Sequence, residues 1–128
     1  MIIIDTSIWI DALQVQDSPQ AREVRNLIAS GQGALIGTIL VEVLRGARSH
    51  DEFEDLREKM GGAFFLDGTE PTWRLASELL LDLRLRGEMI PVADAIIAAH
   101  GLIDGHSIYS TDRHFHRING LQLYEPAG

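Results

Sequence analysis

Four acidic residues occupy positions in this chain where an unpaired carboxylate would be costly. Asp5 directly follows the apolar run MIII, and Asp112 follows the segment SIYST. Glu42 is the only acid in ILVEVL, and Asp94 is the only acid in PVADAIIAA. An ionised carboxylate that is removed from water needs a charged partner, hydrogen bonds or a metal ion. These four positions are therefore the first candidates for a functional site.

A shared divalent cation would explain why the four acids occur where they do. Two like charges about 4 Å apart repel by roughly 4 kcal/mol at an effective dielectric constant near 20. Ligands that are all oxygen favour Mg²⁺ or Mn²⁺, and the absence of cysteine and of a His-x-x-x-His helix argues against zinc. Such a cation lowers the pKa of bound water and offsets charge on a phosphate. The chemistry that fits is hydrolysis of a phosphodiester by water.

Each acid also has a structural interpretation of its own. Asp5 could end its strand in an Asx-type turn, and Asp94 could stabilise a helix N-terminus through the helix dipole. Glu42 could pair with a buried Arg45, and Asp112 could cap a short final turn. Four such coincidences in one chain are harder to explain than one shared site.

Apolar segments alternate with amphipathic ones along the chain, and this alternation predicts the elements that carry the acids. Strands are predicted at MIII, GALIG, AFFL, SIYS and LQLYE, and helices at SPQAREVRNLIASG, TILVEVLRG, SHDEFEDLREKMGG, PTWRLASELLLDLRLRG and VADAIIAAHGLI. Short, uniformly apolar strands separated by helices are typical of a parallel sheet with helices on both faces. Ligands bind such sheets in the crevice beyond the carboxyl ends of the strands, where Asp5 and Asp112 would lie.

The composition indicates one domain over residues 1–128. The chain has no run of about 20 apolar residues and no basic region followed by a long apolar stretch, so we expect no membrane span, no signal peptide and a cytoplasmic location. Cysteine is absent, which fits a reducing compartment. The formal net charge of −8 does not favour nucleic-acid binding, so such a role would depend on local cations or a bound metal.

Four segments of the chain resemble the PIN-domain proteins of the VapC type, the toxins of bacterial and archaeal toxin–antitoxin pairs. In chain order they are DTSIWID, ILVEVLRGA, PVADAIIAAHG and TDRHF. The resemblance implies a five-stranded parallel sheet with helices on both faces, cleavage of RNA with Mg²⁺ or Mn²⁺, a homodimer, and inhibition by a cognate antitoxin. Carried over by position, Asp5, Glu42, Asp94 and Asp112 match the acidic residues of the family.

The resemblance also implies roles for the residues around these acids. The three aspartates would hold the metal directly or through water, and Glu42 would either be a further ligand or orient the attacking water. Ser7 and Thr111 match hydroxyl positions that either contact metal-bound water or brace an acid. Apart from the resemblance, Arg113 and Arg117 are candidate contacts for RNA phosphates near the site, although arginines in a solvated loop need no function. His114 and His116 form a His-x-His pair, which we expect to lie exposed in a loop.

Clustered acids are also compatible with other functions. A receiver-like signalling domain would use Asp67, after the segment FFL, as phosphoacceptor, but such domains need an acidic pair after the first strand and a lysine late in the chain. Here Asp5 is followed by Thr6, and the only lysine is Lys59. A non-catalytic PIN-like scaffold that binds RNA or protein is a second alternative, and the presence of all four acids argues against it. A DNA flap nuclease is a third, and the chain lacks the extra elements for threading a flap.

Overall fold

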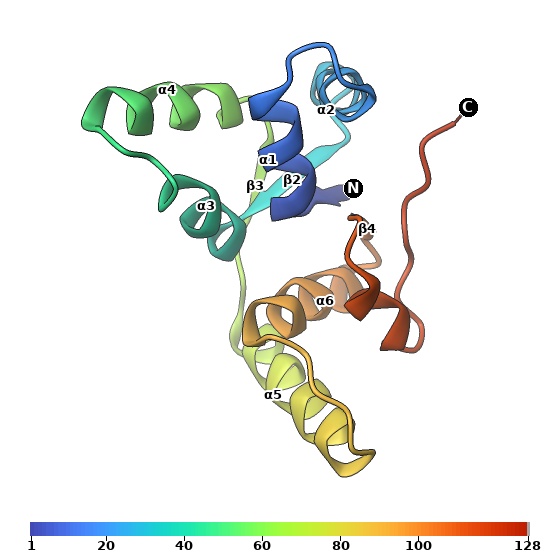
Figure 1. Cartoon of the computed structure of the whole chain (residues 1–128). Coiled ribbons are helices and arrows are strands. Elements are labelled where there is room, and N and C mark those ends of the chain that lie inside the picture. The colour runs from blue at the N-terminus through green and yellow to red at the C-terminus, as the bar shows by residue number, and fades with distance from the viewer. Residues whose placement is uncertain (128) are drawn as a thin grey trace.

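The computed structural model describes residues 1–127 and forms a parallel α/β fold (Figure 1). Within these residues the sheet has four strands in the order β3-β2-β1-β4. All the strand pairs are parallel, with Ile3 of β1 opposite Ala34 of β2 and Ile108 of β4. The strands are β1 (Ile2–Ile4), β2 (Gly33–Ile36), β3 (Phe64–Leu66) and β4 (Ser107–Tyr109).

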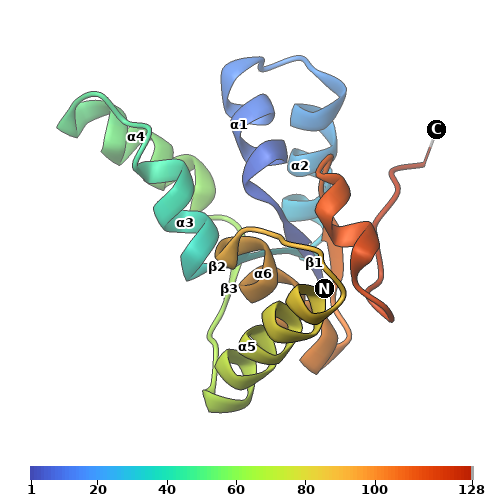
Figure 2. The same cartoon turned by 60° about the horizontal axis from the view of Figure 1, so that its bottom comes forward.

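Helices cover the sheet from two sides, as the alternation of the sequence predicts, but the first of them, over Thr6–Gln14, is not among the predicted helices. They are α1 (Thr6–Gln14), α2 (Pro19–Ala29), α3 (Gly37–Leu44), α4 (His50–Met60), α5 (Glu70–Leu85) and α6 (Val92–Asp104), followed by the 3₁₀ helix η1 (Arg113–Arg117). Both views place α1 and α2 on one side of the sheet and α5 and α6 on the other (Figures 1 and 2). None of the described helices has the length and apolar character that a membrane crossing requires.

Local sequence signals account for both ends of α2. The Ser18 hydroxyl accepts a hydrogen bond from the Ala21 backbone N–H at the start of α2, and Pro19 occupies the first turn. Gly31, just past the end of α2, has a φ of 73°, a conformation that glycine adopts without steric cost. These signals confirm the predicted boundaries of the second helix.

The core consists of the strands and the faces of the helices that meet them. Ile3, Ile4 and Ile36 in the central strands have no exposed surface, and neither does Ile97 on α6. Helix α6 lies across the sheet with residues of nearly all its faces buried. Its single acidic residue before the last turn, Asp94, is therefore held in apolar surroundings at the end nearest the site.

The expectation of five strands is wrong within the described residues. The segment LQLYE contributes only an isolated bridge, in which the Ile108 N–H donates to the Gln122 carbonyl and the Tyr124 N–H donates to the Ile108 carbonyl. Pro126 follows two residues after Tyr124 and has no N–H to extend the ladder. The neighbouring strand β4 is itself only three residues long, so it offers little edge for pairing.

Candidate active site

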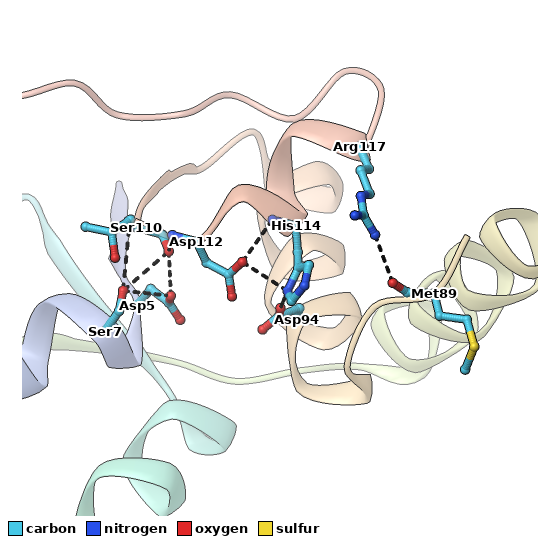
Figure 3. Close-up of polar contacts among 9 residues, drawn as sticks. Asp5, Ser7, Met89, Asp94, Ser110, Asp112, His114 and Arg117 are labelled. Atoms are coloured by element: carbon cyan, nitrogen blue, oxygen red, sulfur yellow. Dashed lines mark hydrogen bonds and ion pairs between the residues drawn. The ribbon is translucent and has the colours of Figure 1, made fainter. Parts of the chain in front are cut away.

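The carboxyl ends of β1 and β4 bring distant parts of the chain to one edge of the sheet. Ile4 is paired with Tyr109, so the residues that follow these two strands lie beside each other. Asp5 comes from the end of β1, and Asp112 comes from the turn between β4 and η1. Asp94 reaches the same edge from the first turn of α6. Figure 3 shows the three carboxylates facing one another across this edge.

Asp5 is buried, and hydroxyl groups hold its carboxylate. It occupies the N-cap position of α1, yet its side chain makes no cap hydrogen bond. Its Oδ2 accepts hydrogen bonds from Ser110 Oγ at 2.6 Å and from Ser7 Oγ at 3.2 Å. Burial raises the pKa of Asp5 above its usual value, and hydrogen bonding to Ser110, to the Thr6 backbone and to Ser7 opposes that shift. Because the side chain makes no cap hydrogen bond and bonds to Ser110 and Ser7 instead, the Asx-turn interpretation of this residue is wrong.

Ser110 joins Asp5 to Asp112 and is not among the site residues predicted from the sequence. Its hydroxyl donates to Asp5 and accepts a hydrogen bond from the Asp112 backbone N–H at 2.9 Å. Ser110 directly follows β4, just as Asp5 directly follows β1. Position after a strand was thus the signal that could have identified it. Thr111, which was selected, contributes a long backbone contact of 3.5 Å from its N–H to Ser7 Oγ.

His114 bridges the other two aspartates. Its Nδ1 lies 2.8 Å from Asp94 Oδ2 and 3.0 Å from Asp112 Oδ1. One ligand atom from each of these three residues lies within 4.8 Å of the others. The expectation that His114 is an exposed loop residue is wrong, because η1 begins at Arg113 and turns the imidazole towards α6. His116 is exposed, as expected.

Burial and the neighbouring carboxylates disfavour the ionised form of Asp94. The pKa of Asp94 is raised to about 6, chiefly by burial and further by the nearby carboxylates of Asp112 and Asp5. The hydrogen bond from His114 opposes this shift. Asp112 also accepts the backbone N–H of His114 at 2.9 Å and so caps η1. Its structural role as a cap and its place in the cluster therefore coexist.

Glu42 lies at the α3 side of the site and belongs to a separate contact. Thr6 Oγ1 donates a hydrogen bond of 2.8 Å to Glu42 Oε1. Thr6 is the residue after Asp5, so one side chain links the Glu42 carboxylate to the segment that carries Asp5. The alternative pairing with Arg45 is wrong, because Arg45 is exposed and makes no ion pair within residues 1–127.

Two other residues selected from the sequence lie outside these contacts. Arg113 is exposed on η1, one residue before His114. Asp67 follows β3 at the far edge of the sheet, two strands from β1, and lines a small pocket with Trp73 and His100. The phosphoacceptor that a receiver-like domain would need is thus separated from the clustered acids.

The chain is similar in sequence to one family model and to several named ribonucleases. The sequence model of the PIN domain matches residues 2–121. The VapC ribonuclease Mb1587 of Mycobacterium bovis and the ribonuclease VapC11 of Mycobacterium tuberculosis are each 30% identical to the chain over 129 residues. The alignments cover 95% of this chain and 96% of each relative.

Solved structures share the fold at lower sequence identity. VapBC2 from Rickettsia felis, bound to a promoter DNA fragment, superimposes with a TM-score of 0.84 at 19% identity over 97% of this chain and 98% of that one. VapBC from Salmonella typhimurium, bound to DNA, gives 0.82 at 19% identity over 96% of both chains. VapC20 of M. tuberculosis, a toxin that cleaves the sarcin–ricin loop, gives 0.71 at 19% identity over 98% of this chain and 100% of that one.

Proposed function

The chain belongs to the PIN-domain family, and we propose that it is a metal-dependent endoribonuclease that acts as the toxin of a toxin–antitoxin pair. It is a VapC-type ribonuclease by its identity to curated VapC ribonucleases over nearly its whole length. The proposal adds the metal, the residues that carry the reaction, and the partners.

The observation that supports a metal-dependent reaction is the donor set at the carboxyl edge of the sheet. Asp94, Asp112 and His114 offer ligand atoms within 4.8 Å of one another, and no lysine or arginine pairs with either aspartate in the described part of the chain. Burial already disfavours the charged form of Asp94. A hard divalent cation would relieve the repulsion between these carboxylates, and their oxygens fit Mg²⁺ or Mn²⁺, with His114 beside them as a positioning residue.

Asp5, Asp94 and Asp112 are the proposed metal-holding residues. When bound, Mg²⁺ or Mn²⁺ lowers the pKa of a water molecule and offsets the negative charge on the phosphate. Ser110 and Ser7 fix the Asp5 carboxylate through their hydrogen bonds. His114 positions Asp94 and Asp112 relative to each other.

Two residues at the margins of the site are assigned by position. Glu42 accepts a hydrogen bond from Thr6, the residue after Asp5. It either adds a ligand or orients the attacking water. Arg113 and the exposed backbone near Thr111 are candidate contacts for RNA. Water is the nucleophile in this proposal, because no Ser–His–Asp arrangement with an exposed serine is present at the described edge of the sheet.

Cleavage of total RNA with and without Mn²⁺, followed by mapping of the cut ends, tests the proposed function. Asp94→Asn should abolish cleavage and leave the fold intact. Asp104→Asn is the matched control, because Asp104 is exposed at the opposite end of the same helix. Cleavage by Asp94→Asn at the rate of the unmodified chain would remove this residue from the site. An absence of any Mn²⁺-dependent cleavage by the unmodified chain would favour the non-catalytic binding scaffold.

The proposed partners follow from the family and from the complexes with which the chain shares its fold. We infer a cognate antitoxin, because several of the similar structures are toxin–antitoxin complexes. Co-expression with the antitoxin should relieve a growth arrest caused by the chain alone. A homodimer is proposed as well, and cellular RNA as substrate places the proposed action in the cytoplasm.

A further inference from the structure

The 3₁₀ helix η1 presents three different faces because it has about three residues per turn. Phe115 and Ile118 lie on one face and are buried in the core. His114 and Arg117 are also three residues apart, so they share a second face, the one that meets Asp94. Arg113 lies on a third face. The geometry of η1 thus places Arg117, and not Arg113, on the helix face that carries His114.

The backbone of a neighbouring loop holds Arg117 in position. Its Nη1 donates a hydrogen bond of 3.0 Å to the carbonyl of Met89, in the connection between α5 and α6. Figure 3 shows the guanidinium reaching towards this connection from the helix that also carries His114. A guanidinium has five N–H donors, and this bond is the one that the described residues provide. The other donors remain available for an anion.

A second arginine faces the same space. Arg86, at the end of α5, and Arg117 line a groove of about 500 Å³, within the range of about 300–1,000 Å³ for ligand sites. Asn119 adds an amide, and Asp82 is the single carboxylate among the lining residues. Neither arginine has a carboxylate partner within residues 1–127.

We propose that the groove between Arg86 and Arg117 binds a phosphate of the RNA strand beyond the phosphate that is cleaved. This inference rests on the proposed function, because RNA is the polyanion that the site would receive. A guanidinium matches two phosphate oxygens with parallel N–H donors, which favours arginine for this task. The groove also resolves a conflict of charge: a chain with a net charge of −8 needs local cations to hold a nucleic acid.

Binding of a labelled single-stranded RNA, measured in EDTA at several salt concentrations, tests the groove. Arg86→Gln and Arg117→Gln should each raise the Kd about tenfold. Each should also flatten the dependence of log K on log salt by about 0.7, the expected contribution of one phosphate contact in single-stranded nucleic acid. Arg74→Gln is the matched control, because it removes the same charge from the same helix at its other end, where Arg74 forms an exposed ion pair with Glu70.

The salt slope separates RNA contact from a structural effect of Arg117. Loss of the bond to Met89 alone would lower the melting temperature without changing the slope, and Arg86 makes no such bond. With Mn²⁺ present, both variants should raise KM for the same RNA more than they lower kcat.

Two outcomes would contradict the proposal that the groove binds an RNA phosphate. Both can be distinguished from a failure of the proposed function. In the first, the unmodified chain cleaves RNA while both variants keep its affinity and its salt slope. In the second, the variants bind RNA normally but lose affinity for the antitoxin, which would make the groove a protein-binding surface. A chain that cleaves no RNA at all would instead remove the proposed function and the groove together.

Discussion

At the scale of single residues, the site contains carboxylates whose ionised form is disfavoured by burial. Asp5 and Asp94 are both buried, and the pKa of each is raised chiefly for that reason. Hydroxyl groups form hydrogen bonds with Asp5, and one imidazole forms a hydrogen bond with Asp94. Such a site should gain stability from any change that removes the charge or neutralises it, and two predictions follow from this balance.

The first prediction concerns the pH dependence of stability in EDTA. In the unfolded chain Asp94 loses its proton near pH 3.8, whereas in the folded chain it keeps the proton until about pH 6. Between these values the folded state binds more protons, so the free energy of unfolding falls as the pH rises. The loss should be on the order of 2–3 kcal/mol. Urea denaturation from pH 4 to 7 measures it.

Asp94→Asn should remove this part of the pH dependence, and Asp104→Asn should retain it. Parallel curves for the unmodified chain and Asp94→Asn would show that Asp94 does not carry the effect. Mn²⁺ at a concentration of 100 times its Kd should raise the free energy of unfolding at pH 7 by about 2.7 kcal/mol. The same addition should do much less for Asp94→Asn.

The second prediction concerns Ser110, whose hydroxyl serves Asp5 and the Asp112 backbone at once. Ser110→Ala should cost about 1–3 kcal/mol, because it leaves a buried carboxylate and a backbone N–H with fewer partners. It should also reduce RNA cleavage, since Asp5 loses its shortest hydrogen bond. Ser7→Ala removes the longer 3.2 Å bond to Asp5 and contacts of 3.5 Å to Thr111 and Ser110, and should have a smaller effect on both measurements. Equal losses for the two variants would contradict the bridging role of Ser110.

At the scale of elements, α6 must lie close to β4 and to the C-terminal segment for Asp94 to meet Asp112. Gly101 permits this approach. A Cβ at that position would lie 2.9 Å from a methyl of Leu121, 3.0 Å from the His106 carbonyl oxygen and 3.2 Å from Ile108. The carbonyl belongs to the backbone and cannot rotate away, so the helix would have to shift outwards.

The third prediction compares two helical glycines. Alanine exceeds glycine in helix propensity by about 1 kcal/mol, yet Gly101→Ala should destabilise the chain because overpacking costs roughly 1–3 kcal/mol. Gly37→Ala, in the first turn of α3, should be neutral or stabilising, because its Cβ would meet only the Phe65 ring at 3.7 Å. Thermal or urea denaturation measures both. A stabilising Gly101→Ala would show that α6 is not fixed by this contact.

At the scale of the whole molecule, exposed apolar residues gather where α5 ends and α6 begins. Leu81, Met89 and Val92 are 51%, 79% and 62% exposed and line one groove. The sequence places more apolar residues on α5 than its buried face uses, which is the reason to expect a second subunit there. This surface and the groove of Arg86 and Arg117 have no lining residue in common.

The fourth prediction follows from that surface. If the proposed homodimer uses it, light scattering should give twice the 14.2 kDa of one chain, and Leu81→Glu should shift the mass towards one chain. Val15→Glu is the control, because Val15 is 56% exposed in the turn between α1 and α2. A dimer that survives Leu81→Glu would place the interface elsewhere.

The sequence by itself determined the parts of this protein that depend on local patterns. Uniformly apolar runs identified four of the strands, cap residues located the start of α2, and isolated acids in apolar surroundings selected Asp5, Asp94 and Asp112. These features can be read locally because strand burial, capping and the cost of a buried charge each act within a few residues. The family resemblance added the expected order of the acids along the chain.

Only the tertiary structure decided which groups stabilise those acids and where the sheet stops. Ser110 and Asp5 are 105 residues apart, and His114 and Asp94 are 20 apart. An ordinary serine and an ordinary histidine carry no local sign of such partners. The predicted fifth strand failed for the same reason, because pairing with β4 depends on how far two distant segments run side by side. Hydrogen bonds between segments that meet only on folding have no signature in either segment alone.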